Sequence, residues 1–531
     1  MPANGYDHSQ SCLLFTAALL QFIRIPAAQA FGVECITLLT IPLELVTASL
    51  AVASFAVSYA VQPVVRDYAR RDRYYLIQRF IRLHFPVLLA GAAGIAAVVS
   101  FCILLFGRNN QAGYFLPVFA MAILLFLSPS GLVQGAYAGI RSPGPVFVNW
   151  ALTALLTAIL PMAVGRKLYR YGKMAGAILR SDELPQIYAA MGLMIGLTLA
   201  FLISFVVWIV LYFLFLRHID EQISASGRGE TESNMSIFFS FSERFTYLAV
   251  TALMLTLPLA VDYGILKRRS ESANFIAEWG YLYSRVFPLV IGGVFLLLIP
   301  FAGYYSSFRN IAHTRGAATL RSFSTMVCRL AVYCAAPLSF FFLSAALVVT
   351  SLPKGVENRA ATAGMQHGAL IMLFLMLCLI LILLGSATAH VMDVMFSSMI
   401  AFVLQSVICY IVTRTSDAVT AVPLSLLVLF ASLFLLLMFA LRRFIRPLPR
   451  WGRRFLVTAA SAAAAAMIVS VMSERMYLMA GAYGALVILA AVYGVIYLFA
   501  TCYFGGVDLE NIARLPGGRF LMRLAEIVER F

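Results

Sequence analysis

The stretch TIPLELVTASLAVASFAVSYAV, residues 40–61, decides the fold of this chain. It runs for 22 residues with one charged side chain, Glu44. A helix needs about 20 residues to cross the hydrocarbon core of a bilayer, which is about 30 Å thick. Because the stretch shows no alternation of apolar and polar residues, it does not fit a strand of a membrane barrel. It predicts a transmembrane helix.

Similar apolar runs recur along the whole chain of 531 residues. Hydrophobic residues make up 62% of the sequence and charged residues 12%, and the mean hydropathy is +0.91. A soluble domain has about 45–50% apolar and about 25% charged residues. We therefore predict an all-α, polytopic protein of the cell membrane with about fourteen transmembrane helices. The predicted spans are 12–32, 35–62, 84–106, 114–139, 145–165, 187–216, 236–262, 278–304, 326–350, 366–389, 391–413, 421–441, 455–473 and 477–503. No cleavable signal is evident before the first span.

The loops predict the orientation, because cytoplasmic loops are rich in Lys and Arg. With both termini in the cytoplasm, the cytoplasmic segments hold 22 of the 39 Lys and Arg residues and the opposite segments hold 13. Segment 165–186 is the exception, since it holds five basic residues on the predicted outer side. Either this segment contacts anionic lipid or the substrate, or the number of spans differs by one.

The net charge of +16 does not predict a nucleic-acid partner. The basic residues are distributed among short loops, which is the pattern that bilayer orientation requires. Segments 64–85 and 504–531 mix arginine with large apolar residues. Both therefore fit amphipathic helices on an anionic leaflet, with a solvated connector as the alternative for 64–85. We expect anionic membrane lipids among the partners.

Two pairs of segments indicate an internal repeat. Segment 64–83 is similar to 307–330, and segment 132–156 is similar to 383–407, at nearly the same separation. We interpret these pairs as two six-helix lobes in the same orientation around a central cavity, a plan that recurs among transporters. The predicted domains are an N-terminal lobe (1–216), a cytoplasmic linker (217–235), a C-terminal lobe (236–441), two additional helices (442–503) and a cytoplasmic tail (504–531).

No pattern in the sequence predicts an enzyme, a cofactor or a metal site. The six histidines are scattered, and the eight cysteines form no C-x-x-C pair. The segment GRKLYRYGKM (165–174) fails the spacing of a phosphate-binding loop. His390 could nominally serve an acyltransferase, but a single histidine at a helix end is usually structural.

Ionisable residues within the predicted spans are the candidate functional residues. A charge at the centre of a membrane helix costs at least about 2.5–3.5 kcal/mol, so it is expected to face a partner or an aqueous cavity. Pro26 follows Arg24 in FIRIPAAQAFG (22–32) and is expected to kink the first helix. The main candidates are Arg24, Glu44, Glu243, Arg244, Asp262 and Arg285; Arg329 and Asp393 lie nearer to helix ends.

The order of several short motifs resembles a known family. These are FIRIPAAQAFG (22–32), Gln134 and Gly135 before the fifth span, WGYLYSRVFPLVIGG (279–293) and GGVDLENIARLPGG (505–518). Together they resemble the multidrug/oligosaccharidyl-lipid/polysaccharide (MOP) exporter superfamily, in its branch of polysaccharide and lipid II flippases that includes stage V sporulation protein B. The sequence departs from that pattern at LELVTASLAV (43–52) and after residue 350.

The resemblance implies a flippase that moves undecaprenyl-pyrophosphate-linked precursors of the cell wall or of a polysaccharide across the cytoplasmic membrane by alternating access. Arginine matches phosphate oxygens with a planar set of donors and stays protonated. Arg24 and Arg285 are therefore expected to contact the substrate headgroup, with Arg244 as the third candidate. Members of the family carry an arginine in the element that matches Arg24.

Several alternatives remain open from the sequence. Arg24 could instead form an ion pair with Glu44, and Arg244 could extend toward the inner surface. Glu44, Asp262 and Glu243 could bind a coupling Na⁺ or H⁺ or serve as charge partners. The alternative functions are a cation-coupled exporter of drugs or metabolites from the same superfamily, or a membrane scaffold for enzymes of wall synthesis.

Overall fold

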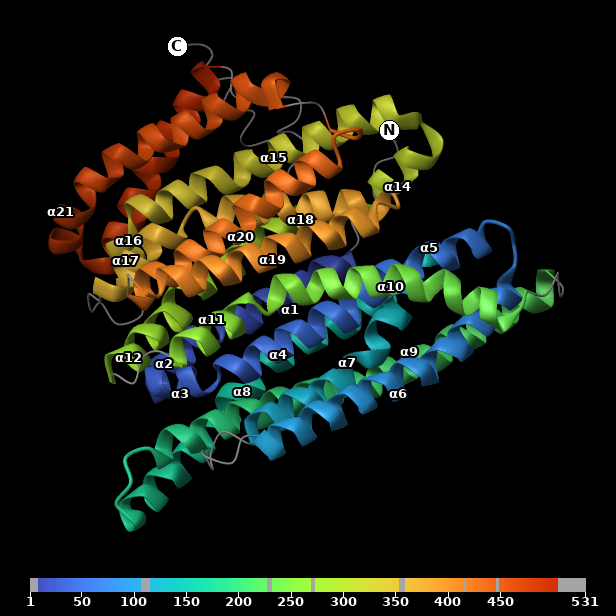
Figure 1. Cartoon of the computed structure of the whole chain (residues 1–531), viewed down its shortest axis with the longest axis horizontal. Coiled ribbons are helices and arrows are strands. Elements are labelled where there is room, and N and C mark those ends of the chain that lie inside the picture. Colours follow the sequence, from blue (N-terminus) through green and yellow to red (C-terminus); the bar gives the residue numbers. More distant parts are fainter. Residues whose placement is uncertain are drawn as a thin grey trace. The chain divides into compact units, whose positions relative to one another are not determined.

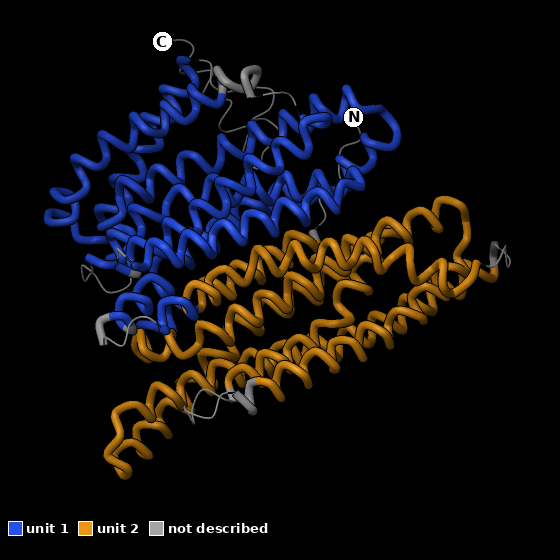
Figure 2. Tube along the Cα trace, viewed as in Figure 1, with its two compact units in different colours: residues 1–6, 24–29, 264–531 blue, residues 7–23, 30–263 orange. Residues whose placement is uncertain are grey.

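The structure is a computed structural model that describes residues 8–106, 115–226, 232–268, 273–352, 359–414, 417–445 and 448–504. All regular secondary structure in these ranges is helical (Figure 1). The chain forms two compact units (Figure 2). Unit 2 contains residues 7–23 and 30–263, and unit 1 contains residues 24–29 and the chain from residue 264 onward. The all-α prediction is confirmed.

Unit 2 is built from helices of the first half of the chain. Its elements are α1 (His8–Phe22), α3 (Val33–Leu38), α4 (Thr40–Leu50), the π-helix η1 (Ala51–Ala56), α5 (Val57–Ala69), α6 (Tyr74–Phe106), α7 (Phe115–Gly139), α8 (Gly144–Leu179), α9 (Leu184–Ser226) and α10 (Asn234–Thr256). Helices α2 (Arg24–Phe31) and α11 (Pro258–Lys267) have residues in both units.

Unit 1 contains the remaining helices. Its elements are α12 (Ala273–Tyr281), the π-helices η2 (Leu282–Val286) and η3 (Pro288–Gly292), α13 (Gly293–Leu298), the 3₁₀ helix η4 (Ile299–Phe301), α14 (Tyr304–Thr314), α15 (Gly316–Ser344), α16 (Ala346–Ser351), α17 (Arg359–Gly368), α18 (Ile371–Ala387), α19 (Val391–Val412), α20 (Ala418–Ala440) and α21 (Leu448–Tyr503).

Eleven helices in the described residues are long and apolar enough to cross a membrane, and two bent helix pairs raise the number to 13. The bent pairs are α10 with α11 and α17 with α18, at angles of 45° and 42°. The predicted number of fourteen is not confirmed. One reason is that the last two predicted spans form a single segment, α21, which contains a non-helical residue at Gly481.

Helix α21 folds back on itself at Gly481. Its backbone there has φ 67° and ψ 177°, a combination that is essentially restricted to glycine. The hydroxyl of Tyr493 donates to the carbonyl of Ala462 at 3.2 Å, so the two halves of α21 lie side by side. Tyr497 ties the hairpin to α15, because its hydroxyl donates to the carbonyl of Tyr333 at 3.0 Å.

The turns of the two units support the predicted repeat. Asp72 after α5 and Gly316 after α14 both have positive φ, and so do Arg141 after α7 and Ala389 after α18. The second pair also shares a helix-ending hydrogen bond, from Ser142 N to Tyr137 O at 2.9 Å and from His390 N to Gly385 O at 3.1 Å. Each pair of turns lies within the segments whose similarity predicted the repeat.

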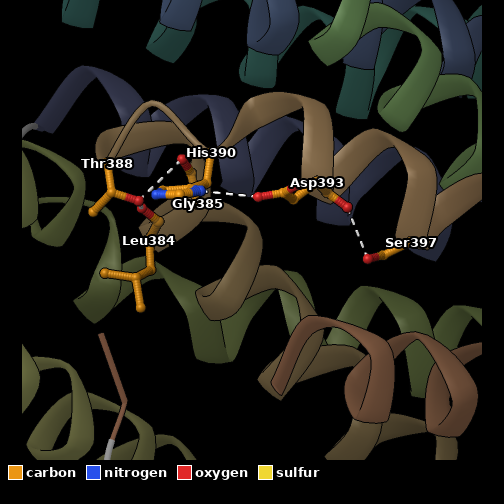
Figure 3. Close-up of polar contacts among 6 residues, drawn as sticks. All are labelled: Leu384, Gly385, Thr388, His390, Asp393 and Ser397. Carbon is orange, nitrogen blue, oxygen red and sulfur yellow. Dashed lines mark hydrogen bonds and ion pairs between the residues drawn. The ribbon is translucent and has the colours of Figure 1, made fainter. Parts of the chain in front are cut away.

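His390 has a structural role in the turn between α18 and α19 (Figure 3). Its Nδ1 lies 2.9 Å from Oδ2 of Asp393 in the first turn of α19. The Ser397 hydroxyl donates to the Asp393 carbonyl at 2.8 Å, and the Thr388 hydroxyl donates to the Leu384 carbonyl at 2.9 Å. These contacts order the helix ends around His390, in agreement with the structural interpretation of that histidine.

Segment 64–85 is not a separate surface helix. Its first residues end α5, residues 70–73 form a turn, and the remainder begins α6, which continues without a break for 33 residues. The mixture of arginine and aromatic residues reflects the last turns of one span and the first turns of the next. The predicted surface helix at 504–531 lies outside the described residues, except for Phe504.

Candidate substrate site

Arg24 lies at a break in the first membrane segment. Helix α1 ends at Phe22, and α2 begins at Arg24 with Pro26 in its first turn. Proline has no backbone N–H and fits best in the first turn of a helix, so its position is consistent with the start of a new helix here. The break leaves α1 in unit 2 and places residues 24–29 in unit 1.

The guanidinium group of Arg24 packs on an aromatic ring. Its Cζ lies 4.0 Å from the centroid of the Tyr283 ring, and both residues have 0% of their surface exposed. Both belong to unit 1. A cation on an aromatic face gains about 2 kcal/mol or more when the pair is removed from water. This contact offsets part of the cost of burying a guanidinium group.

Tyr283 is itself held in a row of aromatic side chains. Trp279, Tyr283 and Phe287 follow one another at intervals of four residues and are fully buried. The rings of Trp279 and Tyr283 are stacked at 6.0 Å, and those of Trp279 and Phe287 lie 6.4 Å apart. Tyr283 lies in the π-helix η2, a type of segment that is frequent at functional sites.

Arg285 lies in the same π-helix, two residues beyond Tyr283. It is half-buried, and its Cζ lies 5.4 Å from the centroid of the Tyr281 ring. Its Nη1 donates to the carbonyl of Thr350, near the end of α16, at 3.1 Å. The Thr350 hydroxyl lies 3.1 Å from that of Thr362 in α17. Unit 1 therefore brings Arg24 and Arg285 to one short segment, residues 281–285.

The other four main candidates belong to unit 2. Glu44 in α4 and Asp262 in α11 are buried, with 2% and 0% of their surface exposed. Glu243 and Arg244 lie on α10, where Glu243 is exposed and accepts from the Tyr247 hydroxyl at 3.4 Å, and Arg244 is half-buried. Since Arg24 belongs to unit 1 and Glu44 to unit 2, the ion pair between them stays a prediction.

One residue of the family motifs has a defined structural role. Gln134, part of the pair that carried the family resemblance, accepts from Nε1 of Trp150 at 3.1 Å, so it joins α7 to α8.

The buried arginines Arg66 in α5 and Arg309 in α14 were not singled out from the sequence as site residues. They lie at matching points of the two similar segments, which is the signal that could have identified them.

The described residues include no group of three or more His, Cys, Asp or Glu side chains that could hold a metal ion. The candidate substrate site comprises Arg24, Arg285 and the aromatic row of Trp279, Tyr283 and Phe287. Such a set can bind an anion and stack against flat groups, but it has no evident nucleophile or proton-transferring pair.

No protein-family model and no curated protein matches this chain. Among solved structures, the chain is similar to the lipid II flippase MurJ in an inward closed conformation, with 14% identity and a TM-score of 0.55 over 93% of this chain and 98% of that chain. It is also similar to a MATE protein in complex with MaL6, with 11% identity and a TM-score of 0.60 over 83% of this chain and 96% of that chain. A third similar structure is an outward-facing multidrug resistance MATE family transporter of the MOP superfamily, with 11% identity and a TM-score of 0.56 over 88% of this chain and 96% of that chain.

These likenesses show that the chain has the fold of MOP superfamily transporters, as the resemblance in sequence predicted. The similar structures are transporters and a flippase, not enzymes.

Proposed function

We propose that this chain is a flippase that moves a lipid carrying a pyrophosphate-linked glycan across the membrane by alternating access. The observation that supports this proposal is the buried contact between Arg24 and Tyr283, at 4.0 Å. A scaffold has little reason to maintain a buried guanidinium group in the membrane, because such a charge is costly there. A carrier of an anionic headgroup, in contrast, needs a positively charged group at its binding site.

The geometry of the contact suits a phosphate ligand. An aromatic ring contacts the face of a guanidinium group, whereas the N–H donors lie in the plane of that group. Stacking on Tyr283 and hydrogen bonding to phosphate oxygens therefore do not compete. Arg285, which is held at the Thr350 carbonyl, adds a second positive charge near the same segment. We infer that Arg24 and Arg285 bind the pyrophosphate, and that Arg244 is a third candidate on α10.

The likeness to a MATE protein at a TM-score of 0.60 supports a second candidate, a cation-coupled exporter of drugs or metabolites. The two candidates differ in the charge of the cargo. A site formed by two arginines favours an anionic cargo over a cationic one, because like charges at short range disfavour binding. Glu44, Asp262 and Glu243 are the candidates for binding a coupling Na⁺ or H⁺ or for acting as charge partners.

The test is a leaflet assay on the purified protein in vesicles, with a fluorescent polyprenyl-pyrophosphate glycan and an impermeant quencher that reports the outer leaflet. We expect Arg24→Ala to slow translocation about 10- to 100-fold, which is the effect of losing one hydrogen bond to a charged group. Arg24→Lys should retain part of the rate. Arg217→Gln is the matched control, because Arg217 is exposed and its one ion pair among the described residues is with Glu221, at 3.8 Å. Unchanged translocation in Arg24→Ala would remove this residue from the mechanism, and export of a cationic dye without lipid translocation would favour the second candidate.

A further inference from the structure

Helices α8 and α9 form a hairpin that is longer than a membrane crossing requires. Helix α8 has 36 residues and α9 has 43, whereas about 20 residues span the hydrocarbon core. Residues 145–164 of α8 form an apolar run of 20 residues without a charged side chain. In Figures 1 and 2 the turn between α8 and α9 extends past the other helices of unit 2. The hairpin from residue 165 to its turn therefore lies beyond the hydrocarbon.

This part of the hairpin, the extension, is tightly packed. A Cβ atom added to Gly192 of α9 would lie 2.7 Å from Cα of Gly165 in α8. Nearer the turn, a Cβ atom on Gly172 would lie 2.8 Å from Cβ of Tyr188. The two backbones thus approach closely beyond the apolar run as well as within it, and the extension presents a fixed surface.

The extension carries five exposed cations, Arg166, Lys167, Arg170, Lys173 and Arg180. None of them forms an ion pair or a hydrogen bond with the residues that the structure describes, apart from the backbone of their own helix. Only Lys173 has a further contact, since its Nζ lies 4.8 Å from the centroid of the Tyr169 ring. The charges of this surface are therefore neutralised by solvent ions or by a binding partner.

Three of the cations form a stripe. Arg166, Arg170 and Lys173 are spaced by four and three residues, so they lie on one face of α8. At a rise of 1.5 Å per residue, the stripe extends from about 3 to about 14 Å beyond Val164, the last residue of the apolar run. Long basic side chains extend several ångströms along the helix, which places all three within reach of lipid phosphates.

We propose that this stripe binds the phosphate groups of anionic lipids at the membrane surface where the hairpin emerges. Binding to lipid phosphates would explain the composition of segment 165–186. This segment is rich in Lys and Arg although it lies on the predicted outer side, where loops usually hold fewer basic residues. Such binding also explains why the exposed cations have no acidic partner among the described residues, because an internal carboxylate would compete with the lipid phosphate. The apolar residues Ile178 and Leu179 lie about 20 Å beyond the apolar run, too far out to enter the same leaflet.

The test uses phosphatidylglycerol with a photoreactive group in its headgroup, incorporated into nanodiscs of phosphatidylcholine that contain the full chain. Crosslinked sites are mapped by mass spectrometry, with a phosphatidylcholine probe of the same design as the reference. We expect adducts in residues 166–174 with the anionic probe and few with the zwitterionic one. The triple variant Arg166→Gln/Arg170→Gln/Lys173→Gln should lose about tenfold or more of this labelling, since each cation near a charged surface contributes about fivefold.

Two controls make the outcome decisive. Arg180→Gln removes a cation at the turn, about 24 Å beyond the apolar run, and should leave the labelling of residues 166–174 unchanged. Arg166→Lys/Arg170→Lys keeps the charge and should retain labelling. Equal labelling by both probes, or unchanged labelling in the triple variant, would overturn the proposal. A different result would indicate that the hairpin docks a protein instead. In that case the triple variant would label normally, and a variant at the tip of the hairpin, such as Ile178→Ser/Leu179→Ser, would lose function in cells.

Discussion

Cζ of Arg24 lies 4.0 Å from the centroid of the Tyr283 ring, and neither residue has any exposed surface. The contact joins the first membrane segment of the chain to the π-helix η2. It places the Arg24 guanidinium group on a buried aromatic ring inside unit 1.

This contact predicts an effect of Tyr283 on stability. Tyr283→Leu should lower the free energy of unfolding by about 2 to 3 kcal/mol, because it removes the cation–π contact and the stacking on Trp279. Tyr283→Phe keeps the ring and should retain most of that stability. The measurement is thermal unfolding of the protein in detergent. Equal melting temperatures for the leucine and phenylalanine variants would show that the ring does not stabilise Arg24.

The close approach of α8 and α9 predicts the effect of small substitutions along the hairpin. Gly192→Ala should destabilise the protein by about 1 to 3 kcal/mol, because the new methyl group overlaps the backbone of Gly165. The matched control is Gly91→Ala in α6, where a Cβ atom would have no heavy atom within 4 Å. That variant should be neutral or up to about 1 kcal/mol more stable, because alanine is the better helix former. The opposite order of stability would contradict the close packing.

Glu232 anchors the start of α10 to α5, α6 and the turn between them. It accepts from the Tyr68 hydroxyl at 2.9 Å and pairs with Arg73 at 3.3 Å, and its carbonyl accepts from Arg79 at 2.8 Å. Glu232→Gln should weaken this anchor by about 0.5 to 1 kcal/mol, since the Arg73 pair is partly exposed. Hydrogen exchange should then become faster in the first turns of α10. Glu221→Gln, which removes only an exposed pair within α9, should leave that exchange unchanged.

The fold-back of α21 depends on one backbone conformation. Gly481→Ala should destabilise the hairpin by about 1 to 3 kcal/mol, because φ 67° with ψ 177° is strained for any residue with a Cβ atom. Gly494→Ala is the control within the same element, since it has ordinary helical geometry and open space around its Cβ position. A chemical-shift or exchange measurement at Tyr493 would report whether the two halves still pack together. If both variants melt at the same temperature, Gly481 is not required for the fold-back.

The sequence predicted the helical class and the positions of most spans, because a run of about 20 apolar residues has no other stable form in lipid. It predicted the break near Ile23, because Pro26 was expected to kink the first helix, but it did not predict the breaks at Leu39 and Leu257. Ile23, Leu39 and Leu257 interrupt helices in segments whose hydropathy is uniformly high, and hydropathy averages do not register a local change of backbone direction. Pro26 and Pro258 were the available signals for two of these breaks.

For the site, the sequence identified Arg24 and Arg285 because charge within an apolar run is conspicuous. It did not identify Tyr283, because an aromatic residue in a membrane span is ordinary and its partner lies roughly 260 residues away in the chain. The four-residue spacing of Trp279, Tyr283 and Phe287 was visible in WGYLYSRVF, but only a contact gives that spacing a meaning. The pairing of Arg24 with Glu44 and the roles of Arg244, Glu243 and Asp262 stay predictions.

The separation of Arg24 from Tyr283 along the chain has a consequence for biogenesis. Residues 24–29 reach their place in unit 1 only after the eighth predicted span has been synthesised. At about 5 to 20 residues per second, the ribosome needs roughly 10 to 50 seconds to add that much chain. During this interval the newly inserted guanidinium group lacks its aromatic platform, so a lipid headgroup or the insertion machinery must shelter it. Slowing translation between the two residues should therefore increase degradation of the nascent protein, and Arg24→Leu should relieve that sensitivity.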